Sequence, residues 1–313
     1  MKKKYFSKFH HGIMFHRFHR DGTKPDGKGS VSQSQFVKII KLVGVKNILT
    51  PNEWIKKLKN NSFIKSDLCL TFDDGLKSQI NYALPLLEKY KLKAFWFVFS
   101  SVFNNKIDEN ELYNNLIYKN YKSTIIFQKK FFEYCKIKKN LFQSKKFKDY
   151  YRESKKLYRI LSLDDIKYRF IRNIFFSRKE LIKKMNSFLK IKKKDYLKAQ
   201  KLWVNKSDIK KLNNLGHMVG MHSHSHDLNF KGLSRNKQIR EYKLNYEELY
   251  KITKIKPISM SHPLNSYNKE TLKILKKLKI VCGFRSNLVA DKKINKSNLE
   301  IARNDPAYIF KYI

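Results

Sequence analysis

Short apolar runs and longer segments with helical spacing alternate along much of the chain. Residues 68–72 and 94–99 are apolar nearly throughout, a pattern typical of strands buried on both faces, as in parallel sheets and barrels. Between them, a predicted helix carries the apolar residues Ala83, Leu84, Leu86 and Leu87. The stretch therefore predicts a strand–helix–strand crossover unit.

The same alternation continues on both sides of this unit. Ser32 with Gln35 three residues later forms a capping-box pattern, and Thr50 followed by Pro51 predicts a second helix start. Further strands are predicted at residues 12–16, 217–221, 257–261, 280–284 and around 299–302, and further helices at residues 206–215, 236–253 and 269–278. This spacing favours an α/β fold, a distorted (β/α) barrel of about seven strands.

The pattern changes in the middle of the chain. Residues 104–200 consist of helix-compatible runs rich in Lys, Asn, Tyr and Phe, with almost no Gly or Pro. We therefore expect residues 1–103 and 201–313 to form the two parts of the barrel, and residues 104–200 to form a long α-helical insertion. The aromatic residues of this segment fit a helical core face better than a nucleic-acid stacking surface; they are Phe131, Phe132, Tyr134, Phe142, Phe147, Tyr150 and Tyr151.

The most informative feature of the composition is its large positive charge. The chain has 313 residues, 42% of them hydrophobic, and 69 Lys plus Arg against 26 Asp plus Glu give a net charge of +43. Such a charge suits nucleic acid, anionic lipid or phosphorylated substrates, although AT-biased codon usage would produce the same excess of Lys. The sequence contains no zinc-finger spacing, RNA-recognition signature or basic-zipper heptad, so no specific nucleic-acid partner is expected.

The cysteines and the N-terminus indicate a location. Cys69, Cys135 and Cys282 are odd in number, widely spaced and surrounded by apolar residues, which argues against a disulfide framework and for a reducing compartment. The basic N-terminus contains no apolar stretch of signal-peptide length, and no run approaches the roughly 18 apolar residues of a membrane span. We expect a cytoplasmic protein that can rest on the anionic inner-membrane surface through its charge.

Two polar clusters follow predicted strands. Asp73 and Asp74 end the strand at 68–72, where Asp-Asp-Gly is also good turn chemistry. Four of the nine histidines lie within ten positions, from 217 to 226. His222 and His226 share a face whether the backbone is extended or helical. Two imidazoles and one carboxylate form a usual catalytic site for a cation such as Zn²⁺.

The remaining histidines of the second cluster have less defined roles. His224 shares the face of His222 and His226 only if the segment stays extended, so it either contacts substrate or faces solvent. His217 is expected to pack at the start of its strand.

The strings Thr-Phe-Asp-Asp-Gly at 71–75 and His-Ser-His-Ser-His at 222–226 resemble the first two motifs of the polysaccharide deacetylase (NodB-homology) family. The resemblance spans about residues 12–99 and 203–313, with the helical segment as an unusually long insertion. It implies that Asp74, His222 and His226 bind a divalent metal, most simply Zn²⁺, and that Asp73 is the catalytic base.

Two departures from the family pattern leave roles open. The third motif, normally Arg-x-Pro-[Phe/Tyr], corresponds to residues 261–267, where Pro263 and Tyr267 would line the substrate site but the arginine is absent. Arg303 is the candidate replacement that holds Asp73 ionised, with a plain surface arginine as the alternative. The late histidine that usually serves as general acid is also absent. His262 is favoured in that role, His16 either replaces it or lines the pocket, and the remaining alternative is metal-bound water chemistry without such a histidine.

The resemblance predicts hydrolysis of the N-acyl group of an amino sugar. A cytoplasmic location and high positive charge favour a nucleotide- or lipid-phosphate-linked sugar used in surface polysaccharide biosynthesis. Three alternatives remain: a catalytically impaired, deacetylase-like sugar-binding module, a metal-dependent hydrolase of the phosphoesterase or amidohydrolase kind that uses His-x-His, and a basic nucleic-acid-binding protein.

Overall fold

The computed structural model describes residues 9–25, 27–104, 106–157, 161–286 and 297–313. By its internal contacts the chain divides into two compact units. Unit 1 comprises residues 1–25, 29–106 and 200–313, and unit 2 comprises residues 26–28 and 107–199. Among the helices described in these ranges, none is both long and apolar enough to cross a membrane.

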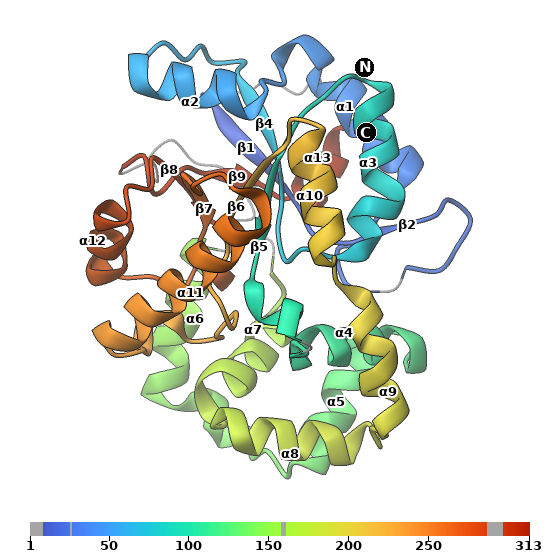
Figure 1. Cartoon of the computed structure of the whole chain (residues 1–313). Coiled ribbons are helices and arrows are strands. Elements are labelled where there is room, and N and C mark those ends of the chain that lie inside the picture. Colours follow the sequence, from blue (N-terminus) through green and yellow to red (C-terminus); the bar gives the residue numbers. More distant parts are fainter. Residues whose placement is uncertain (1–8, 26, 105, 158–160, 287–296) are drawn as a thin grey trace. The chain divides into compact units, whose positions relative to one another are not determined.

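Unit 1 contains a sheet of seven parallel strands in the order β8-β7-β6-β5-β4-β1-β9 (Figure 1). The strands are β1 (His11–Phe15), β4 (Leu68–Phe72), β5 (Phe95–Val98), β6 (Met218–Met221), β7 (Ser259–Ser261), β8 (Cys282–Phe284) and β9 (Arg303–Asn304), and a separate pair is β2 (Phe18–His19) with β3 (Val31–Ser32). Ile301 bridges to Phe284 of β8, and the Gly12 N–H of β1 donates to the Ala302 carbonyl. This segment nearly closes the sheet, so the predicted distorted barrel of about seven strands is confirmed.

Helices surround this sheet, and their starts follow local chemistry. The expected capping box at Ser32 with Gln35 and the expected helix start at Thr50 before Pro51 are confirmed; Thr50 also forms a capping box with Glu53, which was not predicted. The helices of unit 1 are α1 (Gln33–Val43), α2 (Pro51–Asn60), α3 (Leu84–Lys89), α10 (Lys206–Asn214), α11 (Arg235–Thr253), α12 (Lys269–Lys277) and α13 (Pro306–Ile309).

Alternate strand residues face two apolar layers. Cys69, Phe95 and Phe97 belong to one buried cluster, whereas their neighbours Leu70 and Trp96 belong to another that includes apolar residues of α1, α3 and α10. Burial of both faces explains why these strands read as continuous apolar runs.

Two expected boundaries were wrong. The last strand, expected around residues 299–302, is β9 at Arg303–Asn304, and Ile301 makes only a single bridge. The helix expected to include Ala83 begins as an α-helix at Leu84, because Gln79–Ala83 form a π-helical turn. Both differences arise in short segments, where hydrophobic periodicity carries little information.

Unit 2 is helical. Its helices are α4 (Glu109–Asn120), α5 (Thr124–Tyr134), α6 (Lys145–Leu157), α7 (Leu163–Phe170), α8 (Arg178–Phe188) and α9 (Lys193–Ala199). Phe131 and Phe147 are buried, and Phe147 packs edge-on against Phe170, while Tyr134 remains exposed but contacts Phe188. Phe131 and Phe147 therefore contribute to the core of this unit, as expected for a helical core face.

Candidate metal centre and catalytic site

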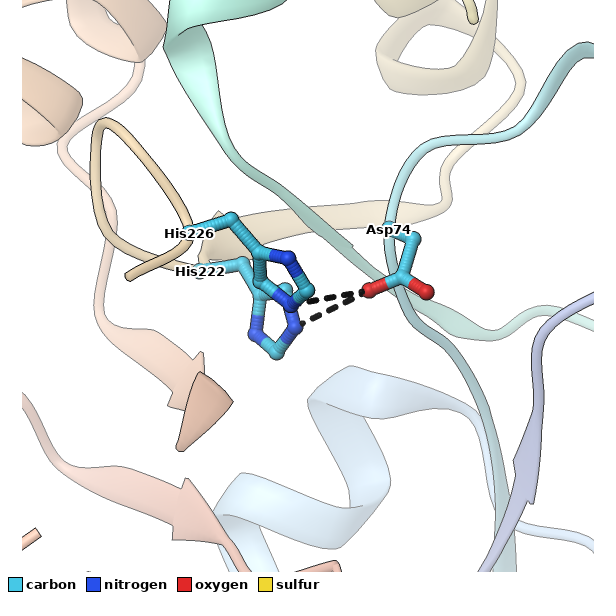
Figure 2. Close-up of side chains that lie close together, drawn as sticks. All are labelled: Asp74, His222 and His226. Carbon is cyan, nitrogen blue, oxygen red and sulfur yellow. Dashed lines mark ion pairs between the residues drawn. The ribbon is translucent and has the colours of Figure 1, made fainter. Parts of the chain in front are cut away.

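Three side chains that can bind a metal meet at the carboxyl end of the sheet. Asp74 follows β4, and His222 and His226 follow β6. Asp74 Oδ1 lies 3.2 Å from His222 Nε2 and 3.4 Å from His226 Nε2. Figure 2 shows the three side chains pointing toward one another. Two donors that each bind a tetrahedral zinc ion at about 2.1 Å stand about 3.4 Å apart. The three ligand atoms therefore have the spacing of donors around one cation.

The hydrogen bonds and charges of these side chains also suit a cation. The Ser261 carbonyl lies 2.8 Å from His222 Nδ1 and can only accept, so Nδ1 carries the proton and leaves Nε2 as a lone-pair donor. Burial raises the pKa of Asp74, but His226 and His222, where their rings are protonated, outweigh burial and hold this pKa well below its usual range; a bound divalent cation would act in the same direction. An ionised carboxylate and two imidazoles fit a divalent ion such as Zn²⁺, with coordination positions left for water and substrate.

The turn after β4 separates the two adjacent carboxylates. Asp74 and Gly75 both have left-handed backbone angles, with φ of 71° and 59°. A Cβ at position 75 would lie 2.8 Å from Val98 Cγ1, so glycine is required there both for its conformation and for space. The turn directs Asp74 to the histidines, whereas Asp73 contacts a different group.

Asp73 is buried in a bidentate ion pair with Arg303. Arg303 Nη1 lies 2.7 Å from Asp73 Oδ1, and Nη2 lies 2.7 Å from Oδ2. The Ser261 hydroxyl donates to the same carboxylate at 3.0 Å. Burial raises the pKa of Asp73, but Arg303 outweighs it, so the pKa lies below its ordinary value. The carboxylate is therefore ionised at neutral pH, and the structure places Arg303 where the sequence suggested it.

Arg303 reaches Asp73 from β9 through a gap over β1. A Cβ at Gly12 would lie only 2.9 Å from Arg303 Cγ, so the missing side chain makes room for the arginine stem. Arg303 Nε donates to the Arg285 carbonyl at 2.7 Å, and Nη1 donates to the Thr71 hydroxyl at 3.1 Å. These bonds fix the buried guanidinium and orient it toward the carboxylate.

His16 lies on the open side of Asp73. Its Nε2 is 4.0 Å from Asp73 Oδ2, and its side chain is 27% exposed. Gln79, which the sequence analysis missed, donates from Nε2 to the His16 carbonyl at 2.7 Å and to the Asp73 carbonyl at 2.6 Å. Its position six residues after Asp73, in an otherwise apolar helix face, was the available signal. Gln79 therefore joins the segment that carries His16 to the segment that carries Asp73.

His262 does not have the properties that its expected role requires. Its ring is fully buried and stacks on Tyr267 at 4.0 Å, and its Nε2 donates to the Leu299 carbonyl at 2.8 Å. Burial lowers the pKa of His262 to about 3, so the ring is neutral at pH 7. A general acid must carry its proton at working pH. The geometry thus argues against the preference for His262 over His16.

The other residues expected to contact substrate make contacts within the protein. Pro263 is buried, and the Tyr267 hydroxyl donates to Glu300 Oε1 at 2.9 Å. His224 Nδ1 lies 2.9 Å from the Ser100 hydroxyl, and its ring is partly exposed. His217 accepts the Ala94 N–H at the start of β6, as expected for a packed residue.

This combination of parallel barrel, Asp–His–His cluster and neighbouring ionised carboxylate is typical of barrel hydrolases with a metal centre. The polysaccharide deacetylase family model matches residues 60–123 and 149–283, more than half of the chain. The chain belongs to this family, whose members hydrolyse the amide bond of N-acetyl groups. The match includes parts of unit 2 and ends before Arg303, so it differs from the span expected from the two motifs.

Solved structures with the same fold cover nearly the whole chain. The Streptococcus pyogenes deacetylase PplD in complex with acetate has a TM-score of 0.58 at 16% identity, over 98% of this chain and 99% of that one. A de-N-acetylase from Aggregatibacter actinomycetemcomitans has a TM-score of 0.56 at 10% identity, over 97% of this chain and 99% of that one. IcaB from Ammonifex degensii has a TM-score of 0.52 at 13% identity, over 95% of this chain and 91% of that one. No curated relative matches the sequence significantly.

Proposed function

We propose that the protein uses a divalent cation, most simply Zn²⁺, to hydrolyse the N-acyl group of an amino sugar. The observation that carries this proposal is the meeting of Asp74 Oδ1 with the Nε2 atoms of His222 and His226, next to the Arg303-paired Asp73. A cation held by these three ligands would lower the pKa of water to about 7 and polarise the acyl carbonyl.

The chain's own groups would manage the protons of this reaction. Asp73 is ionised and held in a fixed orientation by Arg303, so it would be available to accept the proton of the attacking water while it remains paired with Arg303. The departing sugar nitrogen needs a proton, because an amide anion is a poor leaving group. His16 is partly exposed and lies beside Asp73, so it is placed to supply that proton.

The assignment of the proton donor predicts different effects for two histidines. His16→Gln should reduce kcat by about 10²- to 10⁴-fold, the usual contribution of a general acid, with metal content unchanged. His262→Gln should act mainly on stability, because His262 is packed between Tyr267 and the Leu299 carbonyl. Steady-state kinetics and thermal unfolding of both variants test this assignment. A large loss of kcat in a fully folded His262→Gln protein, with His16→Gln near wild type, would reverse it.

We also propose a sugar linked to a nucleotide or lipid phosphate as substrate, used in building surface polysaccharide at the cytoplasmic face of the membrane. The net charge of +43 supports this, because phosphorylated carriers and anionic lipid surfaces are both attracted to a basic protein. Salt-sensitive co-sedimentation with vesicles of anionic phospholipid, absent with neutral vesicles, is the expected result for the membrane surface.

The test of the proposed function is acetate release together with metal analysis. N-acetylated sugars linked to nucleotides, linked to lipid phosphate or joined in polymers are offered to protein as prepared, protein stripped with a chelator and protein reloaded with Zn²⁺. We expect activity that disappears on stripping, returns with the cation and is highest on a phosphate-linked sugar. Binding of sugar without turnover in metal-loaded protein would instead support the impaired binding module, and phosphate release would support a phosphoesterase.

A further inference from the structure

The segment that carries His222 and His226 contains two residues with left-handed backbone angles. Between His222 and His226, Ser223 has a φ of 63° and His226 has a φ of 53°. Both lie in the left-handed region, which residues other than glycine seldom occupy without support from their surroundings. The supporting groups therefore help to determine where the two imidazoles point.

Two of these supporting groups come from α11. Asn245 is fully buried; its Oδ1 accepts the His222 N–H at 2.9 Å, and its Nδ2 donates to the Val98 carbonyl at 3.0 Å. Val98 and Met221 are the last paired residues of β5 and β6. Asn245 thus joins the two strands where their own pairing ends and fixes the backbone of the first histidine ligand.

The second group lies one helical turn earlier. Glu241 Oε2 accepts the backbone N–H groups of His224 at 3.1 Å and Ser225 at 2.7 Å. Positions 241 and 245 are four residues apart, so the two side chains leave the same face of α11. The Ser223 hydroxyl accepts the His226 N–H at 3.2 Å. Four backbone N–H groups of the segment 222–226 are therefore bound by side chains.

We infer that Glu241 and Asn245 of α11 are positioning residues that hold the segment 222–226 so that His222 and His226 face Asp74. Neither residue touches the candidate cation site directly. They act through the backbone of the ligand segment and set the separation of its two imidazoles. This inference rests on the proposed metal site and adds the groups that shape it.

The experiment measures Zn²⁺ affinity by competition with a chromophoric chelator. Glu241→Ala and Asn245→Ala should weaken binding by about 10- to 100-fold, the usual effect of losing groups that orient metal ligands. Glu241→Gln keeps an acceptor without the charge and should weaken binding less than Glu241→Ala. Glu247→Gln and Asn236→Ala change exposed residues on the same helix and serve as matched controls.

A role in positioning also predicts how activity responds to metal. Activity of the α11 variants should recover largely at saturating Zn²⁺. Because a bound cation also stabilises a poorly folded protein, thermal unfolding of the metal-stripped variants is measured as well, and the Glu241 variants should unfold close to the controls. If Asn245→Ala does not fold, the two Glu241 variants decide the question, because Glu241 is only partly buried. Wild-type protein that binds no cation would overturn the proposed function and the inference with it. Wild-type binding with affinities of the Glu241 and Asn245 variants equal to those of the controls would overturn the inference alone.

Discussion

Asp74→Ala should lose both bound Zn²⁺ and deacetylation, whereas Asp73→Asn should keep the metal and lose turnover. Asp74 supplies the carboxylate that faces both imidazoles, so its removal leaves two neutral ligands with activity no higher than that of metal-stripped protein. Asp73 contacts Arg303 and Ser261 instead of the two imidazoles, and loss of a general base costs about 10²- to 10⁴-fold in rate. Elemental analysis and acetate release on the same samples separate the two effects.

The control for this pair is Asp149→Ala, which removes an exposed carboxylate of unit 2 and should change neither metal content nor rate. Stoichiometric metal in Asp74→Ala would show that Asp74 is not a ligand. Loss of metal in folded Asp73→Asn would show that the two adjacent carboxylates do not have separate roles.

Arg303→Met should lower the free energy of unfolding by about 3–5 kcal/mol at neutral pH, because it leaves the buried Asp73 carboxylate without its counter-charge. The pKa of Asp73 lies below its ordinary value because Arg303 outweighs burial. Without Arg303, burial dominates and this pKa rises. The acid limb of the activity profile should therefore move to higher pH in the variant.

The contribution of Asp73 to stability changes with pH in opposite directions in wild type and in Arg303→Met. In wild type, the depressed pKa of Asp73 adds stability above the unfolded-state pKa, and this is lost as pH falls through the folded-state value. In Arg303→Met, a raised pKa favours folding at low pH, so the difference between the proteins should narrow as the solution is acidified. Denaturant unfolding at several pH values measures this difference.

The double variant Arg303→Met/Asp73→Asn gives the sharper comparison. It removes both charges, so it should be more stable than Arg303→Met alone. Arg152→Met, at an exposed position of unit 2, should change stability little. Equal stability of Arg303→Met and wild type across the pH range would contradict the ion-pair interpretation.

The barrel could be predicted from the sequence because its strands, which are buried on both faces, appear as continuous apolar runs, and because its helices begin at strong N-caps. Residues 68–72 contain no polar residue except Thr71, whose hydroxyl donates within the sheet, so β4 falls where the apolar run does. Parallel strands place their carboxyl ends at one edge, which explains why residues after β4 and β6 could be expected to meet. The proximity of Asp74 to His222 and His226 thus follows from pattern and topology.

Other parts of the site depend on side-chain direction, which a linear pattern does not contain. His262 adjoins Pro263 in the chain, but left-handed angles at Leu264 and Asn265 turn the loop, and the ring is buried under Tyr267. Asn245 lies in the middle of a long amphipathic helix, where an asparagine ordinarily faces solvent. Only the packed structure shows that it binds the end of β6.

The two residues of the buried ion pair are synthesised at different times, because Arg303 lies in the segment that closes the barrel. Asp73 and Arg303 are separated by 230 positions in the chain. At ordinary elongation rates of about 5–20 residues per second, roughly 10–50 s pass between the emergence of the carboxylate and that of its guanidinium partner. The three candidate metal ligands are complete at His226, before Arg303 is synthesised. Asp73 therefore gains its charge partner only when β9, which carries Arg303, joins the sheet.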